Sequence, residues 1–184
     1  LFRSCNRIDR NTGGIVIAAK TAEGLRVMNQ KIRDRELKKY YLCIVHGTLP
    51  RPAGRLEGYI LKDEAKKQVT VSSRPRPGAK TAVTLYETLA VRNGLSLVRC
   101  QLITGRTHQI RAQFAAAGHP LLGDGKYGSE RQNKRYGRSY QALYSYRLEF
   151  CFTTDAGALA PLDGQQFQVE QVDFVTEYFP GFSL

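Results

Sequence analysis

The strongest constraint on the fold is a pair of long strand patterns separated by a tight-turn signal. Residues 80–90 and 95–102 are rich in β-branched, leucine and aromatic side chains, a composition that favours strands. Arg92-Asn93-Gly94 lies between them. Asn-Gly is typical of two-residue hairpin turns, because both residues tolerate the positive φ that such turns require. The sequence therefore predicts an antiparallel hairpin.

Two helices are predicted, at residues 21–36 and 107–117. In the first, Thr21 is a candidate N-cap, and apolar side chains recur at roughly helical spacing from Leu25 to Ile32. The second is closed by Gly118, with Pro120 beyond it. Both helices are short enough to flank a sheet.

Further strands are predicted at residues 14–20, 40–45, 55–61, 139–153 and 167–172. We find no strict βαβ repeat, no internal repeat and no low-complexity tract. The pattern predicts an α+β fold with a largely antiparallel mixed β-sheet and a few flanking helices. At 184 residues, the chain is expected to form a single domain, residues 1–184.

The charge balance points to a phosphate-rich partner. Lys and Arg number 28 against 16 Asp and Glu, which gives a net charge of +12 and a pI near 9.8. The segment that begins at Lys126 interleaves Tyr127, Tyr136 and Tyr140 with basic residues, and so offers both charge and stacking surfaces. A solvated basic face is the alternative, but we favour nucleic acid.

Cysteine and histidine usage argues against disulfides and metal sites. Cys5, Cys43, Cys100 and Cys151 contain no C-x-x-C pair, which favours free thiols and a cytoplasmic location. The three histidines lack a metal-binding spacing, so we predict no metal. Apolar runs of about half a dozen residues are too short to span a membrane. Because the chain starts at Leu1 without Met, we expect that a region precedes it.

A lone carboxylate lies between two cations in the stretch from Asn6 to Gly14. Asp9 stands between Arg7 and Arg10, just before an apolar run. One interpretation is a surface ion pair, worth about 0–1 kcal/mol. The other is a catalytic aspartate that neighbouring cations keep ionised. This stretch alone does not decide between them.

A second informative stretch is Gly105-Arg106-Thr107-His108-Gln109-Ile110-Arg111. It follows a strand and begins a helix, where free N–H groups and the helix dipole favour anions. A cation at position 111 is disfavoured there unless a carboxylate lies opposite, and Asp9 is one candidate. Taken singly, His108 is more often structural than catalytic, and Arg106 could be a solvated loop residue.

Four segments in order resemble the RluA-type pseudouridine synthases, enzymes that modify large-subunit ribosomal RNA and, in some relatives, transfer RNA. The segments are Arg7–Gly14, Lys39–Gly47, Gly105–Arg111 and Gly118–Gly128. Two features depart from the family. Asn6 and Ile8 stand where it usually has His and Leu. Its Lys-Pro motif and common N-terminal RNA-binding domain would lie upstream of Leu1.

The resemblance implies the pseudouridine synthase catalytic fold, an isomerase that acts on RNA and no cofactor. It makes Asp9 the catalytic aspartate, Arg111 its ion-pair partner and Tyr41 an active-site tyrosine that stacks near the uracil. Arg7 would fill the gap that a flipped uridine leaves. We assign further RNA contacts to Arg106, His108, Gln109 and Lys126.

Several alternatives stay open at this point. The chain could be a catalytically silent RNA-binding relative, or a nucleoside hydrolase that works through Asp9. The substrate could be ribosomal or transfer RNA, with ribosomal RNA preferred. Asp9 could act as a nucleophile or as the base that removes the C2′ proton. We expect a monomer with no small-molecule cofactor and no membrane association.

Overall fold

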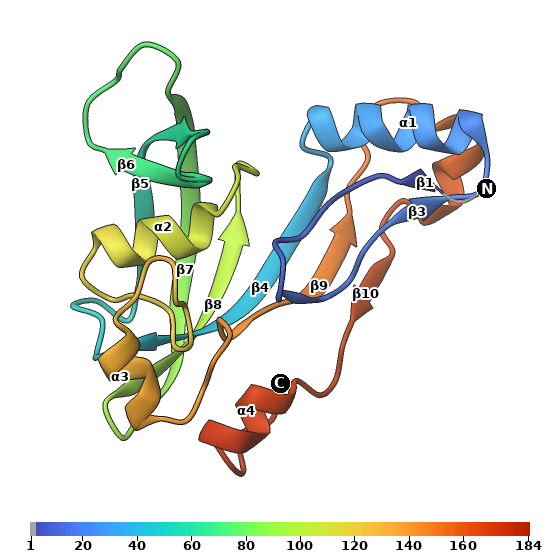
Figure 1. Cartoon of the computed structure of the whole chain (residues 1–184). Helices are drawn as coiled ribbons and strands as arrows, with labels where there is room; N and C mark the ends of the chain where they lie inside the picture. The colour runs from blue at the N-terminus through green and yellow to red at the C-terminus, as the bar shows by residue number, and fades with distance from the viewer. Residues whose placement is uncertain (1–2) are drawn as a thin grey trace.

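The computed structural model describes residues 3–184 and has the predicted α+β fold, with one large sheet flanked by short helices (Figure 1). The strands are β1 (Arg3–Ser4), β2 (Gly13–Gly14), β3 (Ala18–Ala19), β4 (Leu37–His46), β5 (Ala53–Asp63), β6 (Gln68–Ser72), β7 (Lys80–Arg92), β8 (Leu95–Leu102), β9 (Leu143–Phe150) and β10 (Gln166–Gln168). The helices are α1 (Ala22–Arg33), α2 (Gln109–Ala116), α3 (Glu130–Arg135), the 3₁₀ helix η1 (Gly157–Leu162) and α4 (Asp173–Tyr178).

The large sheet has the strand order β10-β9-β4-β8-β7-β5-β6, and neighbouring strands along this path are antiparallel. β2 adds a short parallel pairing beside β9, so the sheet is mixed, as predicted. The predicted hairpin is confirmed as β7–β8. At its turn, Asn93 has φ 51° and Gly94 has φ 75°, the positive values that a two-residue hairpin turn requires.

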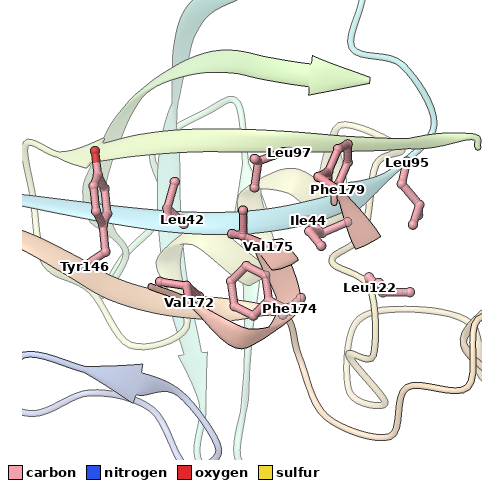
Figure 2. Packing of buried hydrophobic residues seen from close by; sticks show 11 residues of the cluster. Leu42, Ile44, Leu95, Leu97, Leu122, Tyr146, Val172, Phe174, Val175 and Phe179 are labelled. Carbon is pink, nitrogen blue, oxygen red and sulfur yellow. The ribbon is translucent and has the colours of Figure 1, made fainter. Parts of the chain in front are cut away.

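The two faces of the sheet are covered by different helices, because side chains alternate along the central strand β4. Leu42 and Ile44 pack against α4 and the residues just before it (Figure 2). Phe174, which belongs to α4, is fully buried in this cluster. Tyr41 and Cys43 point to the other face, which packs against α2 through Ile110 and Phe114, among others. β4 is therefore buried on both faces, and Tyr41 belongs to the face covered by α2.

The strand predicted at residues 14–20 is wrong. Only Gly13–Gly14 and Ala18–Ala19 pair, in two different places, and Val16 between them is 49% exposed. Ile15 and Ile17 instead contribute side chains to a small core with Met28 of α1. The apolar pattern of this segment thus signals packing under α1 rather than a continuous strand.

The remaining predicted elements match in kind: β4, β5 and β7 are longer than predicted, β8 has the predicted bounds, and both helices and the last two strands are shorter. Thr21 caps α1 by accepting a hydrogen bond from the Gly24 amide at 3.0 Å, as predicted. The strands predicted at 139–153 and 167–172 shrink to β9 and β10, and the second helix begins at Gln109 rather than at 107. β6, α3, η1 and α4 were not predicted. The four cysteines are free, as expected. Among the helices of residues 3–184, none is long and apolar enough to cross a membrane.

A buried ion pair fastens the C-terminal end of α1 to the segment after β9. Lys31 is 1% exposed, and its Nζ donates to Glu36 Oε2 at 2.7 Å and to the Thr154 carbonyl at 2.6 Å. Glu36 also accepts hydrogen bonds from the hydroxyls of Thr153 and Thr154. The hydrogen bonds from Lys31 and Thr153 lower the pKa of Glu36 to about 2.

We expect Glu36→Gln to lower the melting temperature at pH 7 by several degrees, because it leaves Lys31 buried without its counter-ion. The folded pKa of Glu36 is depressed, so its contribution is present above the unfolded pKa of 4.5 and is lost as pH falls towards about 2. Thermal melts across that pH window should therefore bring wild type and variant together. Glu23→Gln, an exposed change in the first turn of α1, should stay close to the wild-type melting temperature at every pH; a constant gap for Glu36→Gln would contradict the account.

Candidate active site

A pocket of about 680 Å³ opens between the N-terminal segment and the loop that follows β8. Segments far apart in the chain contribute to its lining. They are residues 4–10 and 12, Ile32 of α1, Lys39 and Tyr41 of β4, Lys62 of β5, Leu102 of β8, the turn from Gly105 to Ile110, and Leu143 of β9. The pocket thus brings together the two sequence stretches that hold Asp9 and His108.

Asp9 lies in a tight turn that is tied to the start of β9. The Thr12 amide donates to the Asp9 carbonyl at 3.0 Å, and Asn11 has φ 64°, a value that asparagine tolerates better than most residues. The Gln141 side chain is 5% exposed and donates to the Arg10 carbonyl at 2.6 Å. This buried amide fixes the turn, and with it the direction of the Asp9 side chain.

The two glycines after the turn let the chain approach β9 closely and pair with it. Gly14 has φ +115° and pairs with Ser145 in the parallel register of β2 and β9. A Cβ atom at Gly14 would lie 2.2 Å from the Ser145 carbonyl oxygen, so no other residue fits. The sharp turn between Asp9 and the apolar run therefore brings the backbone directly beside β9, and this pairing anchors the aspartate loop to the sheet.

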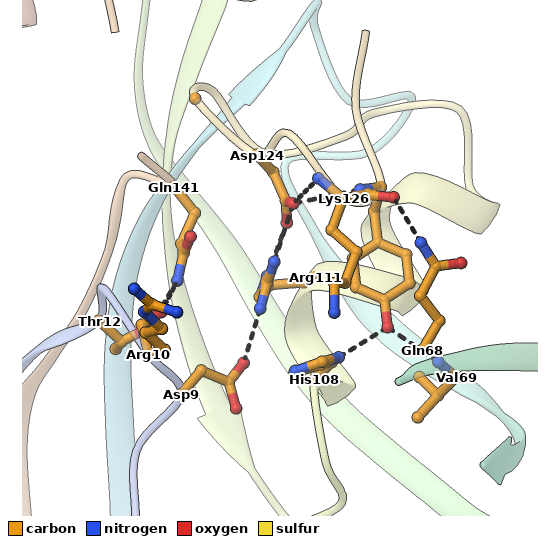
Figure 3. A network of polar contacts seen from close by, with 12 residues as sticks. Asp9, Arg10, Thr12, Gln68, Val69, His108, Arg111, Asp124, Lys126 and Gln141 are labelled. Carbon is orange, nitrogen blue, oxygen red and sulfur yellow. Dashed lines mark hydrogen bonds and ion pairs between the residues drawn. The ribbon is translucent and has the colours of Figure 1, made fainter. Parts of the chain in front are cut away.

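Arg111 meets Asp9, but Asp9 is not its main partner. Its Nε and Nη2 donate to the two oxygens of Asp124 at 2.7 and 2.9 Å, a bidentate pair (Figure 3). Its Nη1 donates to Asp9 Oδ2 at 3.4 Å. The predicted Arg111–Asp9 contact is present, and the structure corrects the prediction by adding a closer carboxylate.

Asp124 is fully buried, with an exposed fraction of 0%. Its Oδ1 also accepts the backbone N–H groups of Lys126 and Tyr127, at 2.9 and 3.1 Å. Burial by itself would raise the pKa of Asp124, but the hydrogen bonds and charge of Arg111, with the two amide donors, outweigh it and leave the pKa lowered. Asp124 is thus a fixed anion behind Arg111.

Tyr127 covers Arg111 and ties His108 to the sheet. The Arg111 guanidinium carbon lies 5.3 Å from the centre of the Tyr127 ring. The Tyr127 hydroxyl is 2.7 Å from His108 Nδ1 and accepts the Val69 amide of β6 at 2.9 Å. Burial lowers the pKa of His108, the Asp9 carboxylate partly opposes this, and the Arg111 and Lys126 cations lower it again, so its imidazole is neutral at pH 7.

Tyr41 and Lys39 line the pocket from β4. Burial raises the pKa of the Tyr41 phenol, a hydrogen bond with Ser145 opposes this by less, and the Asp9 carboxylate raises the pKa again. The phenol is therefore protonated at neutral pH. Burial lowers the pKa of Lys39, and its ammonium lies beside Gly105 in the pocket wall.

A family model for RNA pseudouridylate synthases matches residues 1–116 of the chain. This is more than half of the sequence. The chain belongs to the RNA pseudouridylate synthase family. The RluA-type resemblance drawn from the four motifs is thereby confirmed.

Curated relatives in this family include an uncharacterized RNA pseudouridine synthase of Mycoplasma genitalium, 39% identical over 79% of this chain and 46% of the relative. The ribosomal large subunit pseudouridine synthase C of Escherichia coli is 32% identical over 80% of this chain and 47% of the relative. The chain thus spans about half the length of these curated relatives. The solved structure of human RNA pseudouridylate synthase domain containing 4 has the same fold, with a TM-score of 0.73 and 23% identity over 94% of this chain and 72% of that one.

The residues predicted to contact RNA differ in their exposure and in whether they line the pocket. Arg7 is exposed and lines the pocket. His108 lines the pocket too, but its side chain is partly buried. Arg106 lines it too, while its Nε donates to the Thr81 carbonyl at 3.0 Å. Lys126 is exposed but lies outside the pocket lining, with its Nζ on the Lys67 carbonyl at 2.7 Å.

Gln109 does not fit an RNA contact. Its side chain is 3% exposed, and its amide nitrogen donates to the Val83 carbonyl at 3.0 Å and to Thr84 Oγ1 at 2.9 Å. Its amide oxygen accepts from Thr104 Oγ1 and from the Arg106 amide. Because these bonds occupy the whole side chain, Gln109 fixes the turn before α2 to β7.

The three tyrosines of the basic segment also differ in their hydrogen bonds and in their exposure. Tyr127 is part of the polar network, and the Tyr136 hydroxyl donates to the Asn93 carbonyl at 2.8 Å. Tyr140, by contrast, is 61% exposed and has a ring face available for stacking. Of the three tyrosines, Tyr140 alone stays a candidate stacking surface.

Asn6 stands where the family usually has His, and its side chain is turned away from catalysis. Its Oδ1 accepts the Ile17 amide at 2.8 Å, which joins the two arms of the N-terminal segment. Asn6 therefore has a structural role in this chain, and it also lines the pocket that holds Asp9.

Sequence reasoning missed three residues of the site, namely Asp124, Tyr127 and Gln141. The first two belong to the quoted segment Gly118–Gly128, but Asp124 was assigned no role and Tyr127 was expected only to offer a stacking surface. The cation of Arg111 at a helix N-terminus signalled a missing carboxylate, and Asp124 provides it. Gln141 carried no signal in the sequence. Within residues 3–184, no group of three or more His, Cys, Asp or Glu is arranged to hold a metal ion.

Proposed function

We propose that the chain isomerises uridine to pseudouridine in structured RNA, with large-subunit ribosomal RNA as its substrate. The observation that carries the proposal is a single carboxylate, Asp9, 22% exposed in a pocket and contacted by an arginine that a second, buried carboxylate holds. Family membership supports the reaction type. The name of the Escherichia coli relative supports ribosomal RNA over transfer RNA.

The charge of the pocket suits a phosphate-bearing substrate. Among the described residues that line it, five are Lys or Arg and one is a carboxylate, Asp9; the cations are Arg7, Arg10, Lys39, Lys62 and Arg106. Cations in such a groove attract the RNA backbone and make binding strongly salt-dependent. A nucleoside hydrolase acting on a small substrate would not need this excess.

The reaction breaks the bond between ribose C1′ and uracil N1 and forms one between C1′ and C5. N1 gains a proton, C5 loses one, and no group enters or leaves, so no cofactor is required. Asp9 acts at the ribose, either as a nucleophile at C1′ or as the base that takes the C2′ proton. In both schemes Arg111 donates to the Asp9 carboxylate and places positive charge beside it.

The target uridine has to leave its stack before Asp9 reaches the sugar, because a stacked base hides the glycosidic carbon. Arg7 is exposed at the rim of the pocket and is the residue we assign to the gap left in the RNA. The Tyr41 ring, in the wall of the pocket, stacks on the flipped uracil.

Release of tritium from RNA labelled at uracil C5 tests this function, since only the new C1′–C5 bond displaces that hydrogen. We expect wild type to release tritium to water, to leave the RNA mass unchanged and to release no free uracil. Binding without tritium release would indicate a silent RNA-binding protein. Free uracil would indicate a hydrolase. Either outcome would contradict the proposal.

We expect Tyr41→Phe to bind RNA as wild type does and to form pseudouridine about 10²–10⁴-fold more slowly, the usual contribution of a proton-transfer group. The ring, and with it stacking, is retained, but the hydroxyl is lost; because the phenol is protonated at neutral pH, it takes the C5 proton only after passing its own proton on. Single-turnover tritium release measures this. Tyr40→Phe, the same change on the opposite face of β4, should keep the wild-type rate. A wild-type rate for Tyr41→Phe would reduce the role of Tyr41 to stacking.

A further inference from the structure

We propose that His108 is a catalytic residue that donates a hydrogen bond from Nε2 to O2 of the target uracil, the carbonyl beside the bond that breaks. This inference rests on the proposed function. It replaces the unspecified RNA contact predicted for His108 by a contact with one atom of the base.

The backbone of His108 has a conformation that other requirements of the fold do not explain. His108 is the residue before α2, with φ 52° and ψ 22°, a left-handed conformation that few residues besides glycine adopt. Its side chain makes no capping hydrogen bond to the helix, and the residue lines the pocket instead. Strained conformations of this kind concentrate at functional sites, where the surrounding contacts hold them.

Tyr127 determines which ring nitrogen of His108 carries the proton. The Tyr127 hydroxyl lies 2.7 Å from His108 Nδ1 and already accepts the Val69 amide at 2.9 Å. Within residues 3–184, Nδ1 is the one acceptor in hydrogen-bond reach of the hydroxyl proton. The hydroxyl therefore donates to Nδ1, and the neutral ring carries its own proton on Nε2.

The orientation of the His108 ring leaves Nε2 for the pocket. Tyr127 meets the ring edge-on, with ring centres 5.6 Å apart and planes at 74°. Tyr127 lies outside the pocket lining, so Nδ1 is turned away from the pocket and Nε2, across the ring, is turned to it (Figure 3). In the part of the chain that the structure describes, Nε2 has no hydrogen-bond partner. It is a fixed donor for a bound substrate.

The charge state of His108 favours a carbonyl over a phosphate as its partner. Burial lowers the pKa of His108, the Asp9 carboxylate partly opposes this, and nearby cations lower it again. The neutral imidazole adds little to the attraction of phosphates, which the Lys and Arg side chains of the pocket already provide. A neutral imidazole near a helix N-terminus is well suited to polarising a carbonyl.

The nearness of Asp9 selects O2 rather than O4 of the uracil. The Asp9 carboxylate is close enough to His108 to affect its pKa, and Asp9 acts at C1′ or C2′ of the ribose in both schemes. O2 is bound to the ring carbon next to N1, so it is the base oxygen nearest to C1′. O4 lies at the far side of the ring. A donor beside Asp9 therefore reaches O2.

The contact stabilises the charge that develops when the base detaches. As the C1′–N1 bond breaks, its electron pair stays on the uracil, and negative charge spreads from N1 onto O2. The hydrogen bond from Nε2 strengthens as this charge develops, and the histidine keeps its proton. The C1′–C5 bond then forms, C5 loses its proton and N1 gains one, as in the reaction above. A fixed donor at such an oxygen accelerates a reaction by about 10²–10³-fold.

A purely structural role is the competing explanation, in which His108 only ties the start of α2 to β6 through Tyr127. Such a role would change stability but not the rate per folded molecule. It would also make no distinction between the two oxygens of the base. The two explanations therefore differ in how a substitution at His108 combines with a change of one substrate atom.

The test measures single-turnover tritium release by wild type and His108→Ala from C5-labelled transcripts of large-subunit ribosomal RNA. The transcripts contain uridine, 2-thiouridine or 4-thiouridine, so that sulfur, a weaker hydrogen-bond acceptor, replaces O2 or O4. We expect His108→Ala to slow release about 10²-fold on the uridine and 4-thiouridine transcripts. On the 2-thiouridine transcript the loss should be less than about 10-fold, because the hydrogen bond is already weakened there. Variant and wild type are compared on the same transcript, so effects of sulfur on RNA folding cancel.

His119→Ala is the matched control. His119 Nδ1 bonds to the His46 carbonyl at 2.9 Å, and His119 lies outside the pocket lining. It should keep the wild-type rate per folded molecule on all three transcripts. RNA affinity of His108→Ala should stay within about three-fold of wild type, since phosphate contacts dominate it. If His108→Ala does not fold, His108→Gly replaces it, because glycine adopts φ 52° without strain.

A second cycle uses the uridine transcript alone and tests the link from Tyr127 to His108. Tyr127→Phe removes the hydroxyl that orients the imidazole but keeps the ring against Arg111. We expect it to slow release about 10-fold in wild type, the scale of one lost hydrogen bond. In His108→Ala it should cause no further loss. This cycle decides the question if wild type does not turn over the 2-thiouridine transcript.

Three results would overturn the inference: a His108→Ala rate within about three-fold of wild type, equal losses on the uridine and 2-thiouridine transcripts, or losses at Tyr127 and His108 that multiply. A loss that shrinks with 4-thiouridine instead would overturn the assignment to O2. Failure of the proposed function is distinguishable from all of these, because wild type itself would then release no tritium from the uridine transcript.

Discussion

Asp9→Asn should reduce pseudouridine formation by at least about 10³-fold, the scale expected when the central group of a catalytic unit is removed. The amide has nearly the same shape as the carboxylate, but it neither attacks C1′ nor accepts a proton from C2′. Arg111 Nη1, now 3.4 Å from Asp9 Oδ2, would face a neutral group. Single-turnover tritium release from labelled RNA measures the loss.

RNA affinity of Asp9→Asn should stay within a few-fold of wild type, because phosphate neutralisation by Lys and Arg dominates binding. Asp155→Asn is the matched control: it makes the same charge change at an exposed aspartate outside the pocket and should keep the wild-type rate. Substantial turnover by purified Asp9→Asn would remove Asp9 from the catalytic role.

Arg111→Ala should destabilise the protein by about 3–5 kcal/mol at pH 7, the usual cost of leaving a buried charge without its partner. The stranded charge is chiefly Asp124, which is 0% exposed, rather than Asp9, which opens to the pocket. Activity should fall as well, since Asp9 loses its neighbouring cation.

The stability loss should depend on pH in a defined direction. The folded pKa of Asp124 is depressed, so its contribution is present above the unfolded value of about 3.9 and is lost as pH falls through the folded value. In Arg111→Ala the burial remains without the cation, so protonation of Asp124 relieves the variant. Urea unfolding at about pH 7 and about pH 3.5 should show a deficit that shrinks in acid.

Arg99→Ala provides the comparison for this prediction. Arg99 pairs with Glu87 at the surface, with side chains 38% and 49% exposed, and such pairs contribute about 0–1 kcal/mol. It should lose little stability at either pH. An equal deficit for Arg111→Ala at both pH values would mean that Asp124 does not depend on Arg111.

The sheet was largely predictable, because its signals are local. Asn93-Gly94 fixes the β7–β8 hairpin through φ values that few other residue pairs adopt. The strand predicted over the segment from Ile15 to Ala19 was wrong because its structure depends on tertiary contacts. Its apolar side chains pack against Met28, but its backbone crosses between two short pairings. Hydrophobic pattern reports burial, and only tertiary contacts decide whether a buried segment joins a strand ladder.

The candidate active site was predictable from its motifs up to the partner of Arg111. Asp9 and Tyr41 do line one pocket, and Arg111 contacts Asp9 although it is not itself part of the pocket lining. The choice between Asp9 and Asp124 depends on how the loop after α2 folds back, and no periodicity or spacing encodes that geometry. Gln109 does not suit its predicted RNA contact for a similar reason, since it lines the pocket like its neighbours in the motif but its side-chain amide is occupied by bonds to β7.

The most direct measurement is pseudouridine mapping of total RNA from cells that lack the gene, after incubation with purified protein. Our account predicts that wild type restores pseudouridine at specific uridines of large-subunit ribosomal RNA. Asp9→Asn should restore none, although it is added at the same concentration and binds the RNA. Restoration by Asp9→Asn, or no new pseudouridine with wild type, would contradict it.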